Sequence, residues 1–289
     1  MTNITKLMMN HVHRVCQQSY PYLAKSVLSL ALLGGLSNCT MGNTIISDAS
    51  DSPSQIEDRG DIIMSYEETD DEVLANIRTA LIETEFYDDL ASDLNEILVF
   101  PTDITVVFTT CDEVNAYYDP NAVTITMCYE LIDEFLSIFT ENSETEEDFA
   151  DTVIDASLFT FFHELGHALV DLYELPITGK EEDAVDTFAT IILLDVYEDD
   201  AGALSGMFQF EAEAAEEAEN LESLPFWGEH ALSSQRFYDT VCLIYGSDRQ
   251  EFEFLLEDGY LPEERAEICE EEYEQKSEAW GTLLEPFWK

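Results

Sequence analysis

His163, Glu164 and His167 form an H-E-x-x-H pattern, the residues of this chain best suited to chemistry. Helical residues four apart share a face, so the two imidazoles can both point at one metal ion. Glu164 can then act as general base toward a metal-bound water. The pattern also arises by chance. Without a metal, the two histidines would lie on a helix surface, or they would be hydrogen-bonded by carboxylates in the interior.

The residues around this motif predict a buried helix, as a metal site needs. Gly166 lies inside the predicted helix and costs about 1 kcal/mol relative to alanine. We therefore expect another backbone segment to approach closely at this position. Apolar residues recur at helical spacing through the segment, namely Leu158, Phe161, Phe162, Leu165, Leu169 and Leu172.

A second helix, predicted after residues 175–180, offers the third ligand. Glu182 and Asp186 lie four apart on one face near its start. We predict that Glu182 binds the metal and that Asp186 accepts a hydrogen bond from the outer ring N–H of a ligating histidine. Glu181 and Asp183 point elsewhere, by about 100° per residue, and are the alternative ligands. An acidic first turn favoured by the helix dipole is the alternative without a metal.

This ligand set predicts a zinc-dependent peptidase. His163, His167 and Glu182 leave the fourth position of a tetrahedral zinc open to water, as catalytic zinc requires. Zinc lowers the pKa of that water, and Glu164 takes its proton and later delivers it to the leaving amine.

A second donor usually stabilises the oxyanion in such reactions, and the chain offers His230 as the candidate. The alternative for His230 is a capped surface histidine. Arg236 is expected to form a structural ion pair with one of the many carboxylates, and Tyr238 is expected in the core.

The strongly negative charge of the chain argues against proteins that bind nucleic acid or anionic membrane surfaces. It has 289 residues, 46% of them hydrophobic, which suffices for one sizeable core. The formal net charge is −52, from 63 acidic and 11 basic residues. Such a surface repels nucleic acid and anionic lipid, so neither is an expected partner. The acid excess is typical of a halophilic protein, whose self-repulsion salt would screen. The alternative is an ordinary acidic exported protein.

The N-terminus predicts export. Residues 1–39 contain no acidic residue, carry a basic start and end in a short apolar run. That run is too short for a confident membrane span. Cys39 is the last residue of a segment that resembles a lipoprotein cleavage box, so we predict that Cys39 is lipidated. Ordinary signal cleavage after the small residues Gly35 and Ser37 is the alternative. Either way, the mature protein is expected in the periplasm, on the cell surface or secreted.

Four cysteines remain beyond this leader, an even number that suggests disulfides in an exported protein. They allow three pairings, and sequence distance favours Cys111 with Cys128 and Cys242 with Cys269. Zinc binding by these thiols is the alternative, but the chain has no Cys-x-x-Cys spacing.

The remaining pattern predicts an α+β fold, mostly helical with a small antiparallel sheet or hairpin. Residues 40–65 are read as a flexible acidic linker, and residues 66–289 as one metallopeptidase-like domain. Glycines, Gly246 among them, are expected to break the C-terminal helices. The expected elements are helices over 72–86 and up to 98, a strand over 104–108, a strand–turn–strand over 115–128, a helix over about 203–221, and helices over about 231–245, 249–257 and 262–284.

Several separated motifs occur in the order found in a bacterial "putative metallopeptidase" family catalogued as a domain of unknown function. The chain resembles that family over about residues 70–289, and the family's paired cysteines match the pairs above. More remotely, the pattern is similar to gluzincins and ImmA/IrrE-type peptidases. The resemblance implies a zincin-like fold with two His and one Glu on zinc, acting on peptides. The matching segments are 115–118, 128–131, 163–167, 182–186 and 235–238.

One competing class is a non-catalytic exported protein with a structural zinc or calcium site. The acidic segments 141–148 and 270–274 could recruit Ca²⁺, but neither has the alternating spacing of an EF-hand loop. Structural zinc normally has four protein ligands, whereas this chain offers three and a glutamate base. We therefore favour catalysis, and we expect the strand ending near Cys128 to hold an extended peptide along the cleft.

Overall fold

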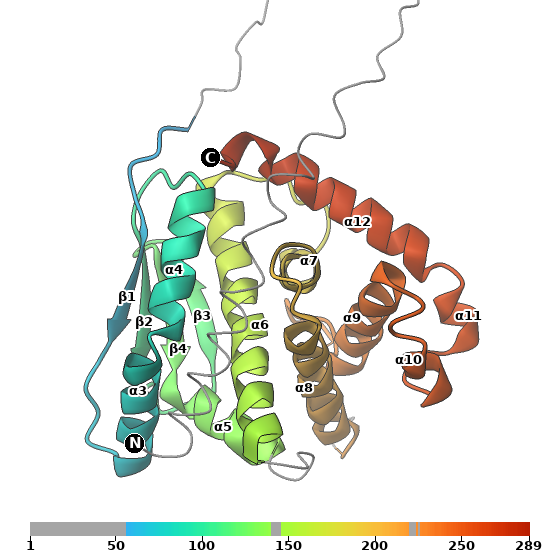
Figure 1. Ribbon diagram of the computed structural model, residues 1–289, viewed down its shortest axis with the longest axis horizontal. Coiled ribbons are helices and arrows are strands. Elements are labelled where there is room, and N and C mark those ends of the chain that lie inside the picture. Colours follow the sequence, from blue (N-terminus) through green and yellow to red (C-terminus); the bar gives the residue numbers. More distant parts are fainter. Residues whose placement is uncertain (1–55, 140–145, 220–223, 225) are drawn as a thin grey trace, which may run out of the picture.

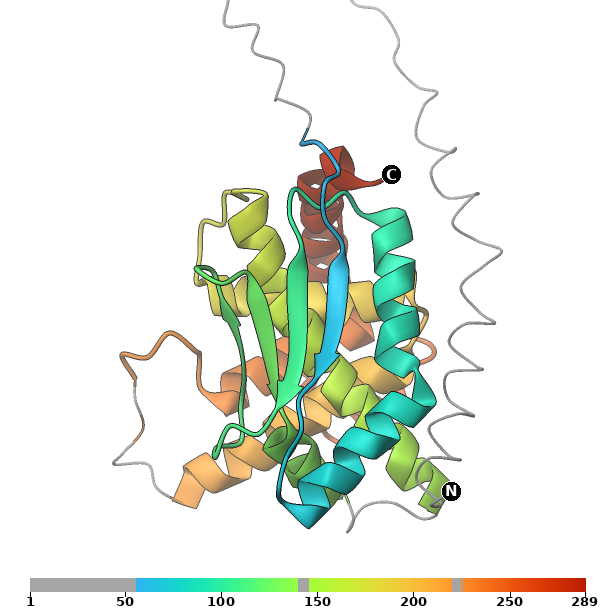
Figure 2. The ribbon, with the colours of Figure 1, turned by 90° about the vertical axis from the view of Figure 1, so that its left-hand side faces the viewer.

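A computed structural model of the chain describes residues 56–139, 146–219, 224 and 226–289. Over these residues the fold is α+β and mostly helical, which confirms the predicted class. One layer is a four-stranded sheet, and the helices lie behind one of its faces (Figures 1 and 2). The predicted export leader, Cys39 and most of the predicted linker lie outside the described residues.

The sheet has the strand order β1-β2-β4-β3, with β1 at Ile62–Tyr66, β2 at Ile104–Thr109, β3 at Ala116–Asp119 and β4 at Thr124–Cys128. Strands β3 and β4 pair antiparallel, which confirms the predicted strand–turn–strand. The sheet as a whole is mixed rather than antiparallel, because β2 pairs in parallel with both β1 and β4. Parallel neighbours need a long crossover connection, and two helices supply it between β1 and β2.

The predicted linker ends earlier than residue 65. Ile62 is buried, and β1 pairs along its whole length with β2. Arg59 and Gly60 also donate backbone hydrogen bonds to the carbonyl of Phe100. The strand Ile62–Tyr66 contains no acidic residue, and its Ile and Tyr favour a strand, but its partners lie about forty residues downstream.

Strand β2 shows why the sheet is covered on one face. Ile104, Val106 and Phe108 are fully buried, and the residues between them are half-buried. Successive side chains of a strand point to opposite faces, so one face meets the helical layer. Tyr87 from the helical layer contacts Phe108 at a ring distance of 4.9 Å.

The helical layer begins with α3 and α4, of which α4 packs against β1 and α3 against α5, and continues through the long helix α6 (Figure 1). No helix of the described ranges is both long enough and apolar enough to cross a membrane. The helices are α3 (Glu72–Thr84), α4 (Phe86–Ile97), α5 (Tyr129–Phe139), α6 (Glu146–Leu172), α7 (Glu181–Ile191), α8 (Asp200–Glu219), α9 (Ser233–Ser247), α10 (Phe254–Glu257), α11 (Glu263–Ala266) and α12 (Cys269–Leu284), with a π-helical continuation of α7 at Ile192–Val196 and a final 3₁₀ turn at Glu285–Phe287.

Gly246 does not break a helix as predicted, because α9 continues to Ser247. A Cβ atom at Gly246 would lie 2.3 Å from the carbonyl oxygen of Cys269. Glycine is therefore needed here for the close approach of the segment that opens α12, and not for a turn.

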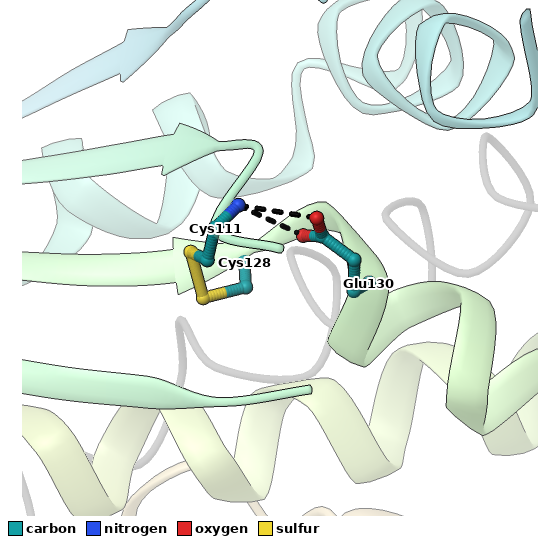
Figure 3. Close-up of side chains that lie close together, drawn as sticks. All are labelled: Cys111, Cys128 and Glu130. Atoms are coloured by element: carbon teal, nitrogen blue, oxygen red, sulfur yellow. Dashed lines mark hydrogen bonds between the residues drawn. A yellow bond between two sulfur atoms is a disulfide. The ribbon is translucent and has the colours of Figure 1, made fainter. Parts of the chain in front are cut away.

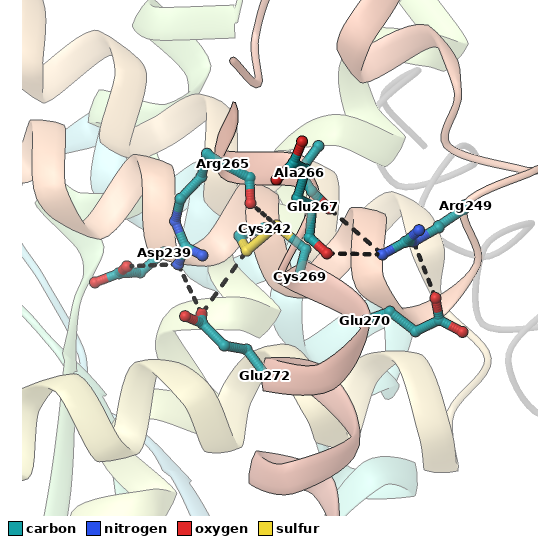
Figure 4. Close-up of a disulfide and its surroundings, with 9 residues drawn as sticks. All are labelled: Asp239, Cys242, Arg249, Arg265, Ala266, Glu267, Cys269, Glu270 and Glu272. Carbon is teal, nitrogen blue, oxygen red and sulfur yellow. Dashed lines mark hydrogen bonds and ion pairs between the residues drawn. A yellow bond between two sulfur atoms is a disulfide. The ribbon is translucent and has the colours of Figure 1, made fainter. Parts of the chain in front are cut away.

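Both predicted disulfides are present. Cys111–Cys128 joins the segment after β2 to the end of β4, and Glu130 accepts hydrogen bonds from the backbone N–H of Cys111 (Figure 3). Glu130 also accepts one from the backbone N–H of Asp112. Cys242–Cys269 joins α9 to α12 and is fully buried. Arginines and carboxylates surround the second disulfide, and Arg265 bonds Glu272 at 2.7 Å (Figure 4).

Candidate metal centre

Helix α6 supplies the H-E-x-x-H residues from the centre of the molecule. Its apolar side chains Phe161, Phe162 and Leu165 are buried in the common core. His163 and Glu164 are also buried, with 5% and 6% of their surface exposed. The predicted buried helix is therefore present.

Helix α7 crosses α6 at Gly166. A Cβ atom at Gly166 would lie 2.9 Å from the Cβ of Val185 and 3.1 Å from Cδ1 of Phe188. The close neighbour is thus a pair of side chains, and not the backbone that the sequence led us to expect. The contact brings the start of α7, with Glu182, over the face of α6 that carries the histidines.

Two carboxylates of α7 hold the outer nitrogens of the two histidines. Asp186 Oδ1 lies 2.7 Å from Nδ1 of His163, which is the contact predicted for Asp186. Glu181 Oε1 lies 2.7 Å from Nδ1 of His167. Sequence reasoning assigned no such contact to Glu181. Both contacts leave the Nε2 atoms free to face a common point.

The Nε2 atoms converge on one oxygen of Glu182. The distances to Glu182 Oε2 are 3.2 Å from His163, 3.5 Å from His167 and 2.9 Å from His230. Donor atoms of His163, Glu182 and His230 all lie within 4.8 Å of one another. All three imidazoles thus surround Glu182 Oε2, and the group of donor atoms that lie mutually within 4.8 Å includes His230, predicted as an oxyanion donor, but not His167.

This arrangement fits a bound metal ion. Glu182 Oε2 is buried and forms no hydrogen bond of acceptable geometry within the described part of the chain, although three imidazole nitrogens surround it. Imidazole and carboxylate donors in tetrahedral geometry suit zinc, with metal–ligand distances of about 2.0–2.2 Å. A cation among these donors would satisfy the orphaned oxygen.

Arg236 binds the carboxylate that contacts His163. Its Nε and Nη2 atoms each lie 2.7 Å from an oxygen of Asp186, so the ion pair is bidentate. The guanidinium also lies over the ring of Phe210, with 4.0 Å between its Cζ and the ring centroid. Arg236 thus makes the structural ion pair expected for it, with Asp186 as the partner, and it fixes the carboxylate that orients His163.

These contacts shift the pKa values of the site. Burial alone would raise the pKa of Glu182, but the surrounding imidazoles hold it far below its ordinary value. Burial opposes protonation of His163, yet its hydrogen bond to Asp186 and the nearby carboxylate of Glu182 raise its pKa to about 9. Burial raises the pKa of Glu164, which suits a group that must accept a proton near neutral pH.

The site opens into a cleft of about 850 Å³. One wall is Asn115 to Tyr118, which belongs to the edge strand β3 and the residue before it. The sequence led us to expect the strand ending near Cys128 in this place, but β4 is paired on both sides. Among the described strands, β3 is the one at the cleft that has a neighbouring strand on one side alone. Tyr118 is anchored there by a 2.8 Å hydrogen bond from its hydroxyl to Asp171.

The other predicted residues lie outside this cluster. Tyr238 is 44% exposed and therefore not a core residue, because it faces away from the buried side of α9. Asp183, an alternative ligand, lines a separate cavity beside α12. Residues 270–274 form the first turns of α12, whereas segment 141–148 lies largely outside the described residues.

The sequence matches one family model, DUF4344, whose description is "Putative metallopeptidase", over residues 66–284. No curated protein and no solved structure matches the chain significantly.

Proposed function

Since the chain belongs to this "putative metallopeptidase" family, we propose that it is an exported zinc-dependent metallopeptidase that hydrolyses peptide bonds. We propose His163, His167 and Glu182 as the zinc ligands, Asp186 as the residue that orients His163, and Glu164 as the general base. Peptides or proteins are the proposed substrates.

The observation that carries this proposal is the convergence of imidazole nitrogens on the orphaned Glu182 oxygen, beside Glu164 and inside an open cleft. A site that only stabilised the fold would need neither the cleft nor a buried carboxyl group with a raised pKa next to the ligands.

Bound zinc would supply Lewis-acid chemistry, lowering the pKa of a water and polarising a scissile carbonyl. Glu164 takes the proton of the attacking water and returns it to the leaving amine. The free edge of β3 pairs with an extended substrate backbone and aligns it beside Glu164. Asp171 keeps Tyr118 fixed in that strand.

Export is part of the proposal and rests on the leader-like residues 1–39 and on the disulfides. We further propose that Cys39 is the lipidated residue, so that any contact with a membrane is made through this anchor.

Glu164→Gln tests the catalytic role. The substitution keeps the shape of the side chain but removes the base, so the variant should bind zinc as the native protein does and cleave peptides at least about 100-fold more slowly. Zinc content is measured by atomic absorption, and cleavage with a broad peptide library followed by mass spectrometry.

The matched control is Glu229→Gln, which removes a neighbouring carboxylate of the cleft wall and should retain cleavage within a few-fold. Cleavage by Glu164→Gln at the native rate would reject the proposal. So would a zinc-loaded native protein that cleaves no library member.

The alternative is a structural metal site in a non-catalytic exported protein. The proximity of His230 to Glu182 favours it, since four protein ligands close a structural zinc site. Under this alternative, metal removal would lower the melting temperature of the protein and no peptide would be cleaved.

A further inference from the structure

His230 lies in the loop before α9, far in sequence from the other site residues. Its Nε2 lies 2.9 Å from Glu182 Oε2, closer than either histidine of α6. Building on the zinc site proposed above, we propose that His230 is a further metal ligand, which closes the coordination in the substrate-free protein and is displaced when substrate binds.

The distances from Glu182 Oε2 to the imidazole nitrogens are those expected between ligands of one metal ion. Donors bound to one tetrahedral zinc at about 2.0–2.1 Å lie about 3.3 Å from one another. The three Nε2 atoms lie 2.9, 3.2 and 3.5 Å from Glu182 Oε2, on either side of that value. The ring of His230 is also nearly parallel to that of His163, at an interplanar angle of 14°. The loop therefore presents His230 in the place of a ligand.

Lys180 holds the loop in this position. Its Nζ donates to the carbonyl oxygens of Gly228 and His230, at 3.3 and 3.2 Å. Lys180 is also the residue that precedes α7, two positions before Glu182. One side chain thus ties the His230 loop to the helix that carries the carboxylate ligand.

His230 differs from the histidines of α6 in ways that suit a displaceable ligand. Its side chain is 58% exposed, against 7% for His163 and 15% for His167. Carboxylates hold Nδ1 of both α6 histidines, whereas no described residue bonds the Nδ1 of His230. A ligand without such a partner binds more weakly and reorients at lower cost.

A displaceable His230 would combine features of the catalytic and the structural metal site. With His230 as a ligand, the residues around the metal would form the closed set of a structural site. Without His230, three proposed ligands would remain beside the cleft. A carbonyl oxygen of a peptide in the cleft would compete with His230 for the metal, while the backbone of the loop stays attached to Lys180.

The test counts imidazoles on the metal. Full-length protein is stripped of metal and reloaded with substoichiometric zinc, and X-ray absorption at the zinc edge is recorded for the native chain and for His230→Ala. The native chain should show three imidazoles and the variant two. Zinc affinity, measured by chelator competition, should fall by about tenfold or more in the variant, since even outer partners of ligands contribute that much.

Two further variants separate ligation from a general effect of the loop. Lys180→Met releases the tether and should lower zinc affinity by less than His230→Ala does. Trp227→Ala changes a neighbouring side chain that is 85% exposed, and should leave both affinity and imidazole count unchanged. Acetohydroxamate, a metal-binding mimic of a substrate carbonyl, should reduce the count from three to two in the native chain and leave His230→Ala at two.

Two imidazoles in the native chain, with zinc bound and with no loss of affinity in His230→Ala, would overturn the inference and leave the proposed peptidase site standing. Three imidazoles that persist with saturating acetohydroxamate would overturn the displacement. Native protein that binds no zinc would overturn the proposed metal site itself.

Discussion

The two histidines of α6 are held by carboxylates in different surroundings. Asp186, which orients His163, has 10% of its side chain exposed and is shared with Arg236. Glu181, which contacts His167, is 48% exposed. Hydrogen bonds to charged groups are stronger where water is excluded, so His163 is the more rigidly oriented ligand.

This difference predicts unequal effects of removing each charge. Asp186→Asn should weaken zinc binding by about 10- to 100-fold, because it loses the charged partner of His163. Glu181→Gln, the matched variant, should weaken it by only a few-fold, because water replaces part of the lost contact. Chelator competition on both folded variants measures the ratio.

Asp186→Asn should also lower the melting temperature, because it leaves the Arg236 guanidinium buried without a counter-charge. Affinity is therefore compared at a temperature where circular dichroism shows both variants folded. Equal losses of affinity would show that burial does not set the strength of these contacts.

Among the elements, the crossing of α6 and α7 decides whether the ligands meet. Val185 and Phe188 fill the space where a side chain at residue 166 would lie. Glu182 lies one turn before Val185, so a displacement of α7 moves the carboxylate away from the histidines.

Gly166→Ala should destabilise the protein in spite of the better helix propensity of alanine. The propensity gain is about 1 kcal/mol, whereas overpacking costs about 1–3 kcal/mol. We expect lower stability in urea unfolding together with weaker zinc binding.

Gly281→Ala is the control, because Gly281 lies in α12 with no atom within 4 Å of a Cβ placed there. This change should stabilise the protein by up to about 1 kcal/mol and leave zinc binding unaltered. If both alanines stabilise the protein, the close contact at Gly166 is not a constraint on α7.

In the described part of the molecule, most of the few cations form specific contacts, while most carboxylates are partly or fully exposed. Arg236 pairs with Asp186, Arg265 with Asp239 and Glu272, and Lys289 with Asp58. The formal net charge of −52 therefore remains largely as repulsion between surface groups. Repulsion of this kind opposes the compact state and is weakened by salt.

We predict that thermal stability rises with salt. The Debye length falls from about 10 Å at 0.1 M to about 3 Å at 1 M, so the midpoint of thermal unfolding should increase between these NaCl concentrations. Calorimetry of the zinc-loaded protein checks this, and coinciding melts would contradict it.

Replacing exposed glutamates of α12 supplies the control. Glu271, Glu274 and Glu278 are exposed on this helix. Their joint change to glutamine should raise the melting temperature at low salt and have little effect at high salt. A gain of the same size in both conditions would point to helix propensity rather than charge.

Much of this molecule follows from local regularities of the sequence. Helical spacing placed His163 and His167 on one face of α6, and Glu182 and Asp186 on one face of α7, because residues four apart in a helix share a face. The second pair predicted Asp186 as the partner of a ligand. Sequence distance and an even cysteine number gave the correct disulfides, since short loops favour those pairs. The α+β class followed from the spacing of apolar residues, which is helical in some segments and strand-like in others.

Other features depend on contacts between elements that are remote in the chain, and only the tertiary structure decided them. The parallel partner of β1 lies across two helices, and the free edge at the cleft belongs to β3 because β4 is enclosed on both sides. Glu181 contacts His167, and His230 approaches Glu182, because α7 crosses α6 at Gly166 and Lys180 holds the loop. Crossing geometry and loop anchoring leave no periodic signal in a sequence, so the sequence did not show that Glu181 contacts His167 or that His230, predicted as an oxyanion donor, lies against Glu182.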